Sequence, residues 1–320
     1  MSLAPYVKIL GRGPGRSRSL TQDEANEALT LILQGAAAPE AVGAMLMLLR
    51  MKGETAAEIA GFASAARGLV RGPNGLVGLD WPSYAAGRTR GAPWFLLAAR
   101  LVAAAGHKVL VHGWNGAGTA ALRAELPGAD VVLAGSVAEA VTLLERHNIA
   151  YLSLESFAPE MHALLRLRDV FGLRSCINTV SRVMNPFGAP AAVQGVFHPP
   201  YRAIQAEAGG LLGLESLSVI KGGGGEFERH PGKPAEADGL RGGSLWSAVL
   251  PASIDDRARL AEGPDPATTL AGLWAGADDD IFAEGVVLGT AALAFETLGE
   301  ADPMAKARAT WAGRDKANRR

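Results

Sequence analysis

The chain has 320 residues, 48% of them hydrophobic, and its 31 Lys and Arg nearly balance its 32 Asp and Glu. This length and apolar content predict one large α/β unit or two domains with a sizeable core. The formal net charge of −1 gives no global signature of a nucleic-acid-binding protein, so any anion-binding surface must come from local clustering. The single cysteine, Cys176, excludes an internal disulfide framework and a cysteine-rich zinc site.

The sequence shows neither a signal peptide nor a membrane span. The N-terminus begins MSLAPYVKILGRG, and the apolar run FLLAARLVAAAG is interrupted by Arg100. Such segments are too short and too polar to cross a bilayer. We therefore expect a cytoplasmic protein with no membrane partner.

Residues 1–70 carry only helical signals. Thr21 with Glu24, and Thr55 with Glu58, have the S/T-x-x-E form of a capping box, which marks two helix starts. Between these starts lies an apolar stripe at helical spacing, which predicts a packing face. The stripe consists of Val42, Met45, Leu46 and Leu49.

A different pattern follows the Pro- and Gly-containing segment 71–78. A helix is expected over Pro93–Ala105, and short apolar runs then alternate with helical or loop sequence. The predicted strands are KVLVHG, VVLAG, IAYLSL, AAVQGVF and LSVI. Strands that alternate with helices predict an α/β domain with a mostly parallel central sheet.

Helical sequence returns at 157–186, which suggests that the helical domain is discontinuous. We expect a small all-helical domain from 1–70 plus 157–186 and a larger α/β domain from 71–156 plus 187–320. A cleft between the two is the expected ligand site, because domain interfaces supply concave surfaces.

Several short segments follow one another along nearly the whole chain. They are LTQDEA, LLRMKGETAAEIAGF, VHGWNG, FAPEMH, LRDVFGLRSCINTV, MNP and QGVFHP. In this order they resemble the anthranilate phosphoribosyltransferase family, glycosyltransferase family 3. The resemblance implies a nucleoside phosphorylase/phosphoribosyltransferase-like fold that closes over phosphoribosyl pyrophosphate (PRPP) and Mg²⁺, where an aromatic amine displaces diphosphate.

The chain departs from this family where a glycine-rich loop would hold PRPP. It reads GLDWPSYAAGRTRGAPWF there, and we expect Leu79 to Pro82 to form a turn that cannot approach a diphosphate closely. Asp80 would also repel phosphate. The candidate ligand contacts in this stretch are Asp80, Ser83, Arg88 and Arg90.

Two further family motifs supply candidate contacts. VHGWN lacks the cation of the family's Lys-His-Gly-Asn motif but keeps His112 and Asn115. Arg168 aligns with the arginine that contacts the anthranilate carboxylate in the family, and its guanidinium suits a carboxylate or phosphate. The alternatives are a structural histidine and a surface ion pair of Arg168 with a neighbouring acid.

The run VIKGGGGEFERHPG lies where the resemblance places acidic magnesium ligands. Glu226 and Glu228 are the candidate metal ligands, and Lys221 with the glycine amides is a candidate anion contact. The alternative is a solvated loop. A P-loop is not expected, because Lys-Ser/Thr does not follow the glycines.

These departures resemble a divergent, TrpD-like branch of the family, which implies a homodimer that binds single-stranded nucleic acid and lacks transferase activity. Basic residues cluster near both chain ends and on either side of the replaced phosphate loop, and Trp81, Tyr84, Trp94 and Trp311 would stack bases if the clusters met in one groove. Solvated basic ends with buried tryptophans are the alternative. The basic residues are Lys8, Arg12, Arg16, Arg18, Arg67, Arg71, Arg88, Arg90, Lys306, Arg308, Arg314, Lys316, Arg319 and Arg320.

Three functions stay open on the sequence. The first is a protein that has lost ordinary PRPP transfer and binds single-stranded DNA or RNA, or a phosphorylated ligand, in its cleft. The second is an active phosphoribosyltransferase that uses Mg²⁺, PRPP and anthranilate or another aromatic amine. The third is a dimeric interaction protein with a vestigial cleft. The homodimer is expected to form through the helical domain, with the apolar stripe at its contact.

Overall fold

The structure, a computed structural model, describes residues 2–13, 15–70, 72–84, 91–114, 116–255 and 268–317. Within these ranges one eight-stranded sheet has the order β3-β4-β2-β1-β5-β6-β7-β8. The first six of these strands are parallel, and β7 and β8 are antiparallel. The strands are β1 Leu79–Ser83, β2 Val109–Gly113, β3 Leu133–Ala134, β4 Ile149–Ser153, β5 Ala191–Val196, β6 Ser216–Lys221, β7 Ala235–Arg241 and β8 Ser244–Leu250.

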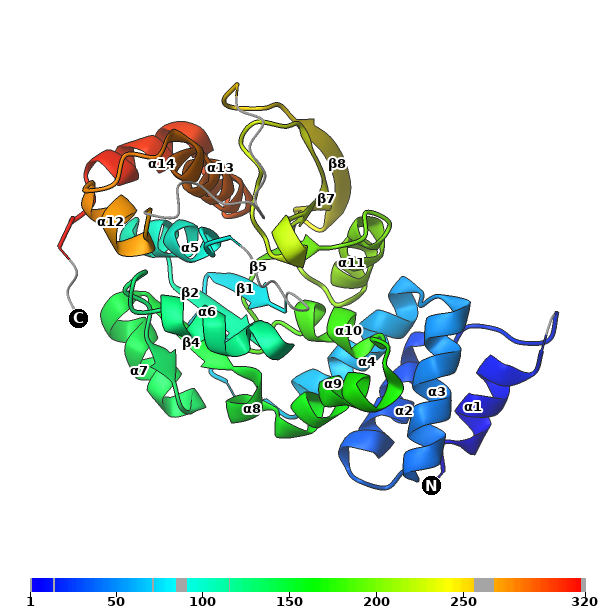
Figure 1. Cartoon of the computed structure of the whole chain (residues 1–320). Helices are drawn as coiled ribbons and strands as arrows, with labels where there is room; N and C mark the ends of the chain where they lie inside the picture. Colours follow the sequence, from blue (N-terminus) through cyan, green and yellow to red (C-terminus); the bar gives the residue numbers. More distant parts are fainter. Residues whose placement is uncertain are drawn as a thin grey trace.

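Helices cover both faces of this sheet (Figure 1). Val109, Val111 and Tyr151 belong to the core beneath α5, α13 and α14, whereas Leu110 and Leu152 belong to the core on the opposite face. Apolar side chains on both faces explain why these strands are continuously apolar in sequence. The helices of the α/β part are α5 Phe95–Ala104, α6 Thr119–Glu125, α7 Val137–His147, α8 Leu154–Phe157, α11 Tyr201–Leu211, α12 Leu270–Ala275, α13 Ile281–Thr297 and α14 Pro303–Ala312.

The N-terminal domain is entirely helical in the described residues. Figure 1 shows α10 beside α4, although the two are far apart in sequence; α9 packs against α10, and all three helices contribute to one hydrophobic core. The predicted fold class is therefore confirmed, while the residue boundaries of the two domains stay a prediction. These helices are α1 Ala4–Gly11, α2 Gln22–Leu33, α3 Pro39–Lys52, α4 Ala56–Arg67, α9 Pro159–Phe171 and α10 Ile177–Val183. None of the helices in the described ranges is long and apolar enough to cross a membrane.

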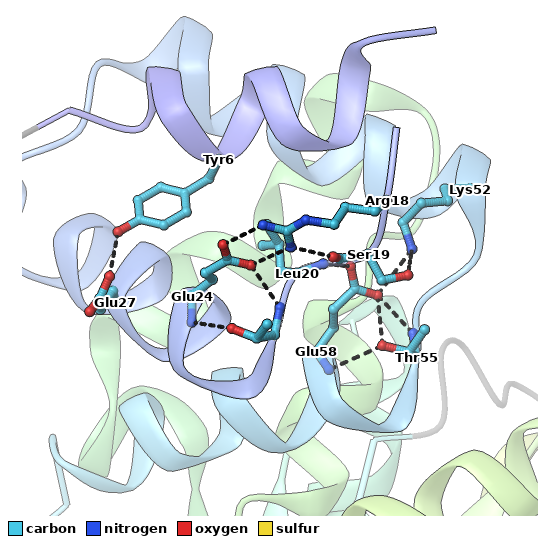
Figure 2. A network of polar contacts seen from close by, with 10 residues as sticks. Tyr6, Arg18, Ser19, Leu20, Glu24, Glu27, Lys52, Thr55 and Glu58 are labelled. Carbon is cyan, nitrogen blue, oxygen red and sulfur yellow. Dashed lines mark hydrogen bonds and ion pairs between the residues drawn. The ribbon is translucent and has the colours of Figure 1, made fainter. Parts of the chain in front are cut away.

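Both predicted capping boxes are present, at the starts of α2 and α4 (Figure 2). Glu58 closes the second box and is fully buried. Its carboxylate also accepts hydrogen bonds from the Leu20 amide at 2.8 Å and from the Lys52 ammonium at 3.1 Å. One side chain thereby ties the start of α4 to the chain before α2 and to the end of α3.

The segment read as a turn in place of the phosphate loop is a strand. Residues 79–83 form β1, which is buried throughout and pairs with β2 along its whole length. Its ladder with β5 covers only Leu79 and Asp80 and stops before Pro82, which has no N–H to donate. The expectation of a turn at Leu79 to Pro82 was therefore wrong, and the segment 85–90 that follows lies outside the described residues.

A β-hairpin also occupies sequence that gave no strand prediction. β7 and β8 are joined by Gly242 and Gly243, whose φ angles are 55° and 74°. Two successive residues with positive φ are typical of a tight hairpin turn with the right-handed twist of the strands.

The apolar stripe of α3 lies inside the chain. Val42 is 8% exposed, and Met45, Leu46 and Leu49 are 0% exposed. The expectation that this stripe forms the dimer contact was therefore wrong, because its surface is already buried within one chain.

We predict that Glu58→Gln lowers the free energy of unfolding by about 2–4 kcal/mol, because the amide offers fewer acceptors to the four donor groups that the carboxylate binds and leaves Lys52 without its counter-charge. Urea denaturation measures this change. Glu40→Gln, at an exposed position of α3, is the matched control and should change stability by no more than about 0.5 kcal/mol. Equal midpoints for the two variants would contradict the prediction.

Candidate functional site

Three of the predicted ligand contacts lie in the interior at the ends of β1 and β2. Asp80, Ser83 and His112 are 1%, 0% and 0% exposed. The Nε2 atom of His112 lies 3.2 Å from Oδ1 of Asp80, and its Nδ1 atom lies 2.9 Å from the Tyr84 hydroxyl. Both side chains are buried beside each other, and within the described chain neither oxygen of Asp80 nor Nε2 of His112 has a hydrogen-bond partner, so their role as ligand contacts stays a prediction.

The two candidate metal ligands are also buried and have protein partners. Oε1 of Glu226 accepts a hydrogen bond from the Ser83 hydroxyl at 3.0 Å, and Oε2 of Glu228 accepts one from the Phe95 amide at 3.2 Å. At 1% and 0% exposure, these glutamates do not form the solvated loop that the sequence left as the alternative. No group of three His, Cys, Asp or Glu side chains that could hold a metal occurs among the described residues.

The four glycines before these glutamates form a tight turn. A Cβ atom at Gly222 would lie 1.6 Å from the carbonyl oxygen of Glu226, and one at Gly195 would lie 2.1 Å from the carbonyl carbon of the same residue. Gly224 and Gly225 have φ angles of 66° and 90°, which disfavour side chains. Close backbone packing of this glycine turn therefore fixes the positions of Glu226 and Glu228.

The aromatic residues proposed to stack bases are core residues. Trp81 is 0% exposed and packs against Phe95 and Phe227, with ring centroids 6.5 Å and 5.4 Å apart. The others have no exposed ring face for a base, so the stacking interpretation was wrong. Tyr84, Trp94 and Trp311 are 0%, 1% and 6% exposed.

The basic N- and C-terminal segments do not meet. Figure 1 places α1 and α14 at opposite ends of the molecule. Arg18 pairs with Glu24 through two hydrogen bonds, and Arg314 donates to the carbonyls of Leu273 and Trp274 at the end of α12. Within the described chain, the groove expected from converging basic ends is therefore absent.

A cleft of about 400 Å³ lies between the helical domain and the β5–α11 connection. Four arginines and one acid, Glu54, line it, and Oε2 of Glu54 accepts a hydrogen bond from the Tyr201 hydroxyl at 2.7 Å. The arginines come from the end of α3, the end of α9, the loop after α9 and the last turn of α10. They are Arg50, Arg168, Arg174 and Arg182.

The arginines crowd one another in a partly dry environment. Burial lowers the pKa of Arg182 to about 10, and burial together with the charges of Arg168 and Arg50 lowers the pKa of Arg174. Arg168 forms no hydrogen bond or ion pair with the rest of the described chain, so the surface ion pair that the sequence left as the alternative is absent there. Because like charges destabilise one another, the cleft favours an anion.

Of the predicted contacts, Arg168 lines this cleft. Lys221 is exposed at the end of β6, beside Val196 of β5, and is not among the residues that line the cleft. Arg88, Arg90 and Asn115 lie outside the described residues. Sequence reasoning missed Arg50, Arg174 and Arg182. The arginines at 168, 174 and 182 share one helical segment, which was a usable signal, whereas Arg50 joins them only through the tertiary fold.

Residues 4–69 match a family model described as "Glycosyl transferase family, helical bundle domain". The chain is 30% identical to the anthranilate phosphoribosyltransferase of Halobacterium salinarum over 287 residues. This alignment covers 86% of this chain and 80% of the relative. The chain belongs to the anthranilate phosphoribosyltransferase family. It is also 31% identical to an uncharacterized protein of Aquifex aeolicus, over 71% of this chain and 70% of that one.

One further relative is matched over less of its length, whereas two solved structures are matched almost throughout. The anthranilate phosphoribosyltransferase of Rubrobacter xylanophilus is 33% identical over 63% of this chain and 60% of the relative. The crystal structure of anthranilate phosphoribosyltransferase from Thermus thermophilus has a TM-score of 0.81 at 24% identity, covering 98% of this chain and 95% of that one. The Saccharomyces cerevisiae enzyme in complex with PRPP and Mg has a TM-score of 0.75 at 18% identity, covering 97% and 93%. These structural similarities show a shared fold.

The described residues do not fit a diphosphate at the start of α5. A helix N-terminus binds phosphate through its free amides, but here the Phe95 amide donates to the carboxylate of Glu228. A second buried carboxylate, Glu226, belongs to the same turn and would repel an anion there. Both glutamates also use oxygens for protein donors, which leaves them poorly suited to share a magnesium ion.

We predict that Gly222→Ala destabilises the protein by about 1–3 kcal/mol, because the new Cβ would lie 1.6 Å from the Glu226 carbonyl oxygen and must displace that backbone. Urea denaturation is the measurement. Gly78→Ala is the matched control, since a Cβ there would lie 3.7 Å from the Lys108 carbonyl oxygen, and its effect should stay within about 0.5 kcal/mol. A stable Gly222→Ala protein would show that the turn is not tightly constrained.

Proposed function

We propose that this member of the anthranilate phosphoribosyltransferase family binds a phosphorylated ligand, single-stranded nucleic acid in particular, in the arginine-lined cleft, and that it lacks ordinary PRPP transfer. The observation that carries the proposal is the group of four arginines against one glutamate in a cleft of about 400 Å³. Guanidinium groups suit phosphate because their planar donors bind two oxygens at once.

The loss of transfer is supported by the chemistry at the start of α5. Transfer needs donors, and commonly a metal, that stabilise the charge developing on the diphosphate. In this chain the first amide of α5 is taken by Glu228, and Glu226 adds a second negative charge nearby. The alternative, an active Mg²⁺-dependent enzyme that joins PRPP to anthranilate or another aromatic amine, is favoured by the 30% identity to named enzymes of the family.

We predict that the full chain binds a labelled single-stranded oligonucleotide in low salt, with an affinity that falls as salt rises, and that it does not convert anthranilate with PRPP and Mg²⁺. Arg168→Gln should weaken binding by about tenfold, because one charge-assisted contact is lost. Fluorescence anisotropy measures binding, and anthranilate fluorescence measures turnover.

The matched control for this experiment is Arg308→Gln, an exposed arginine on α14, which should leave the affinity unchanged. Sustained turnover of anthranilate would favour the alternative. Loss of binding in Arg308→Gln but not in Arg168→Gln would move the binding surface from the cleft to the C-terminal helices.

We further infer a homodimer through the helical domain. With the α3 stripe buried, the apolar surface available there includes Met51 on α3 and Val170 on α9, which are 83% and 78% exposed. Removing such side chains from water favours association. Sedimentation velocity of the wild type should give a dimer, and Met51→Lys should shift it towards the monomer. A monomeric wild type at micromolar concentration would contradict the inference.

A further inference from the structure

The inner wall of the arginine-lined cleft is closed. Three of the residues that line it, Arg182, Val196 and Gln205, are 5%, 2% and 1% exposed. Side chains this deeply buried leave no passage towards the sheet behind them. A ligand therefore enters this cleft from the solvent side, and a chain end or a small molecule can sit against its closed inner wall. The volume of about 400 Å³ lies near the lower end of the range for small-molecule sites, roughly 300–1,000 Å³.

The charge of the cleft also suits a chain end. A phosphate group in the middle of a strand carries one negative charge, whereas a terminal phosphate monoester carries about −1.5 to −2 at neutral pH. Four arginines line the cleft, and the single acid there, Glu54, accepts a hydrogen bond from Tyr201. The excess of positive charge is thus better matched by a terminal phosphate than by an internal one.

An exposed aromatic ring stands in the same cleft. Side chains alternate along a strand, and because Val196 at the end of β5 is buried, the next residue, Phe197, points outwards. Phe197 is 53% exposed and meets His198 edge to face, with ring centroids 4.9 Å apart. An aromatic face that lines a cationic cleft can stack on a nucleobase without selecting its identity.

Gln205 adds a polar contact to the inner wall. Its Oε1 atom is buried and has no hydrogen-bond partner in the described part of the chain. A buried acceptor without a partner is costly, and a ligand hydroxyl or amino group would satisfy it. Sugars and bases of nucleotides carry such groups.

We propose that the cleft recognises the phosphorylated end of a single-stranded nucleic acid, with the terminal phosphate on Arg168 and Arg174 and the terminal base stacked on Phe197. This rests on the proposed function, because it specifies which part of a nucleic acid the cleft holds. The site differs from the start of α5, where Glu228 occupies the helix amide.

The experiment compares short single-stranded DNA probes of one sequence by fluorescence anisotropy with the full chain. One pair carries a 3′ label and either a 5′ phosphate or a 5′ hydroxyl, and a second pair carries a 5′ label and either a 3′ phosphate or a 3′ hydroxyl. We expect at least one phosphorylated end to bind about tenfold more tightly than its hydroxyl counterpart. An unlabelled circular single strand, which has no ends, should compete weakly.

Variants of Phe197 test the stacking contact. Phe197→Ala should weaken binding of the phosphorylated end by about tenfold without changing its salt dependence, and Phe197→Trp should keep the affinity. Failure of every probe to bind in low salt would overturn the proposed function together with this inference. Equal binding of phosphate and hydroxyl ends, or full competition by the circle, would overturn only the inference. An unchanged affinity in Phe197→Ala would remove the base contact.

Discussion

The hydrogen bond from the Phe95 amide to Glu228 constrains what the carboxyl edge of the sheet can bind. A helix start at this edge is a natural site for phosphate, because its amides are unpaired and the helix dipole favours negative charge. In this protein the chain supplies the negative charge itself. Close packing of Gly222 and Gly195 against the Glu226 backbone fixes the turn that carries Glu228, so this carboxylate is built into the fold.

The cleft between the domains is therefore the anion site that we propose, because four arginines line it. Arg182 has two roles there. It donates a hydrogen bond to the Tyr84 carbonyl after β1, which helps to hold the fold, and it contributes positive charge to the lining of the cleft. Burial lowers the pKa values of both Arg182 and Arg174, and the charges of Arg168 and Arg50 lower the pKa of Arg174 further. A bound anion would offset the repulsion between these arginines. The four arginines can also lie together without an anion, because each keeps a part of its side chain that is exposed to water or hydrogen-bonded.

Local signals in the sequence predicted most of the fold. The capping boxes at Thr21 and Thr55 fixed two helix starts because their hydrogen bonds close within one turn. The buried parallel strands β2 to β6 were predicted because both of their faces are apolar. β1 was missed because its Asp and Pro are unusual in a central strand, and they are tolerated by the contact of Asp80 with His112 and by the early end of the β5 ladder at Pro82. Gly242 and Gly243 are a recognisable hairpin signal. The hairpin was not predicted, because the composition of the flanking segments did not indicate strands.

By itself the sequence determined the family, the two kinds of domain and one contact of the candidate site, Arg168, because these follow from short segments read in order. The tertiary structure decided which polar residues are buried and which face the cleft. Asp80, His112 and the two glutamates of the glycine turn lie in the interior, whereas Arg50 and Arg174 reach the cleft from separate parts of the chain. Burial and the meeting of distant segments depend on how the elements pack, and packing involves contacts between residues that no local pattern relates.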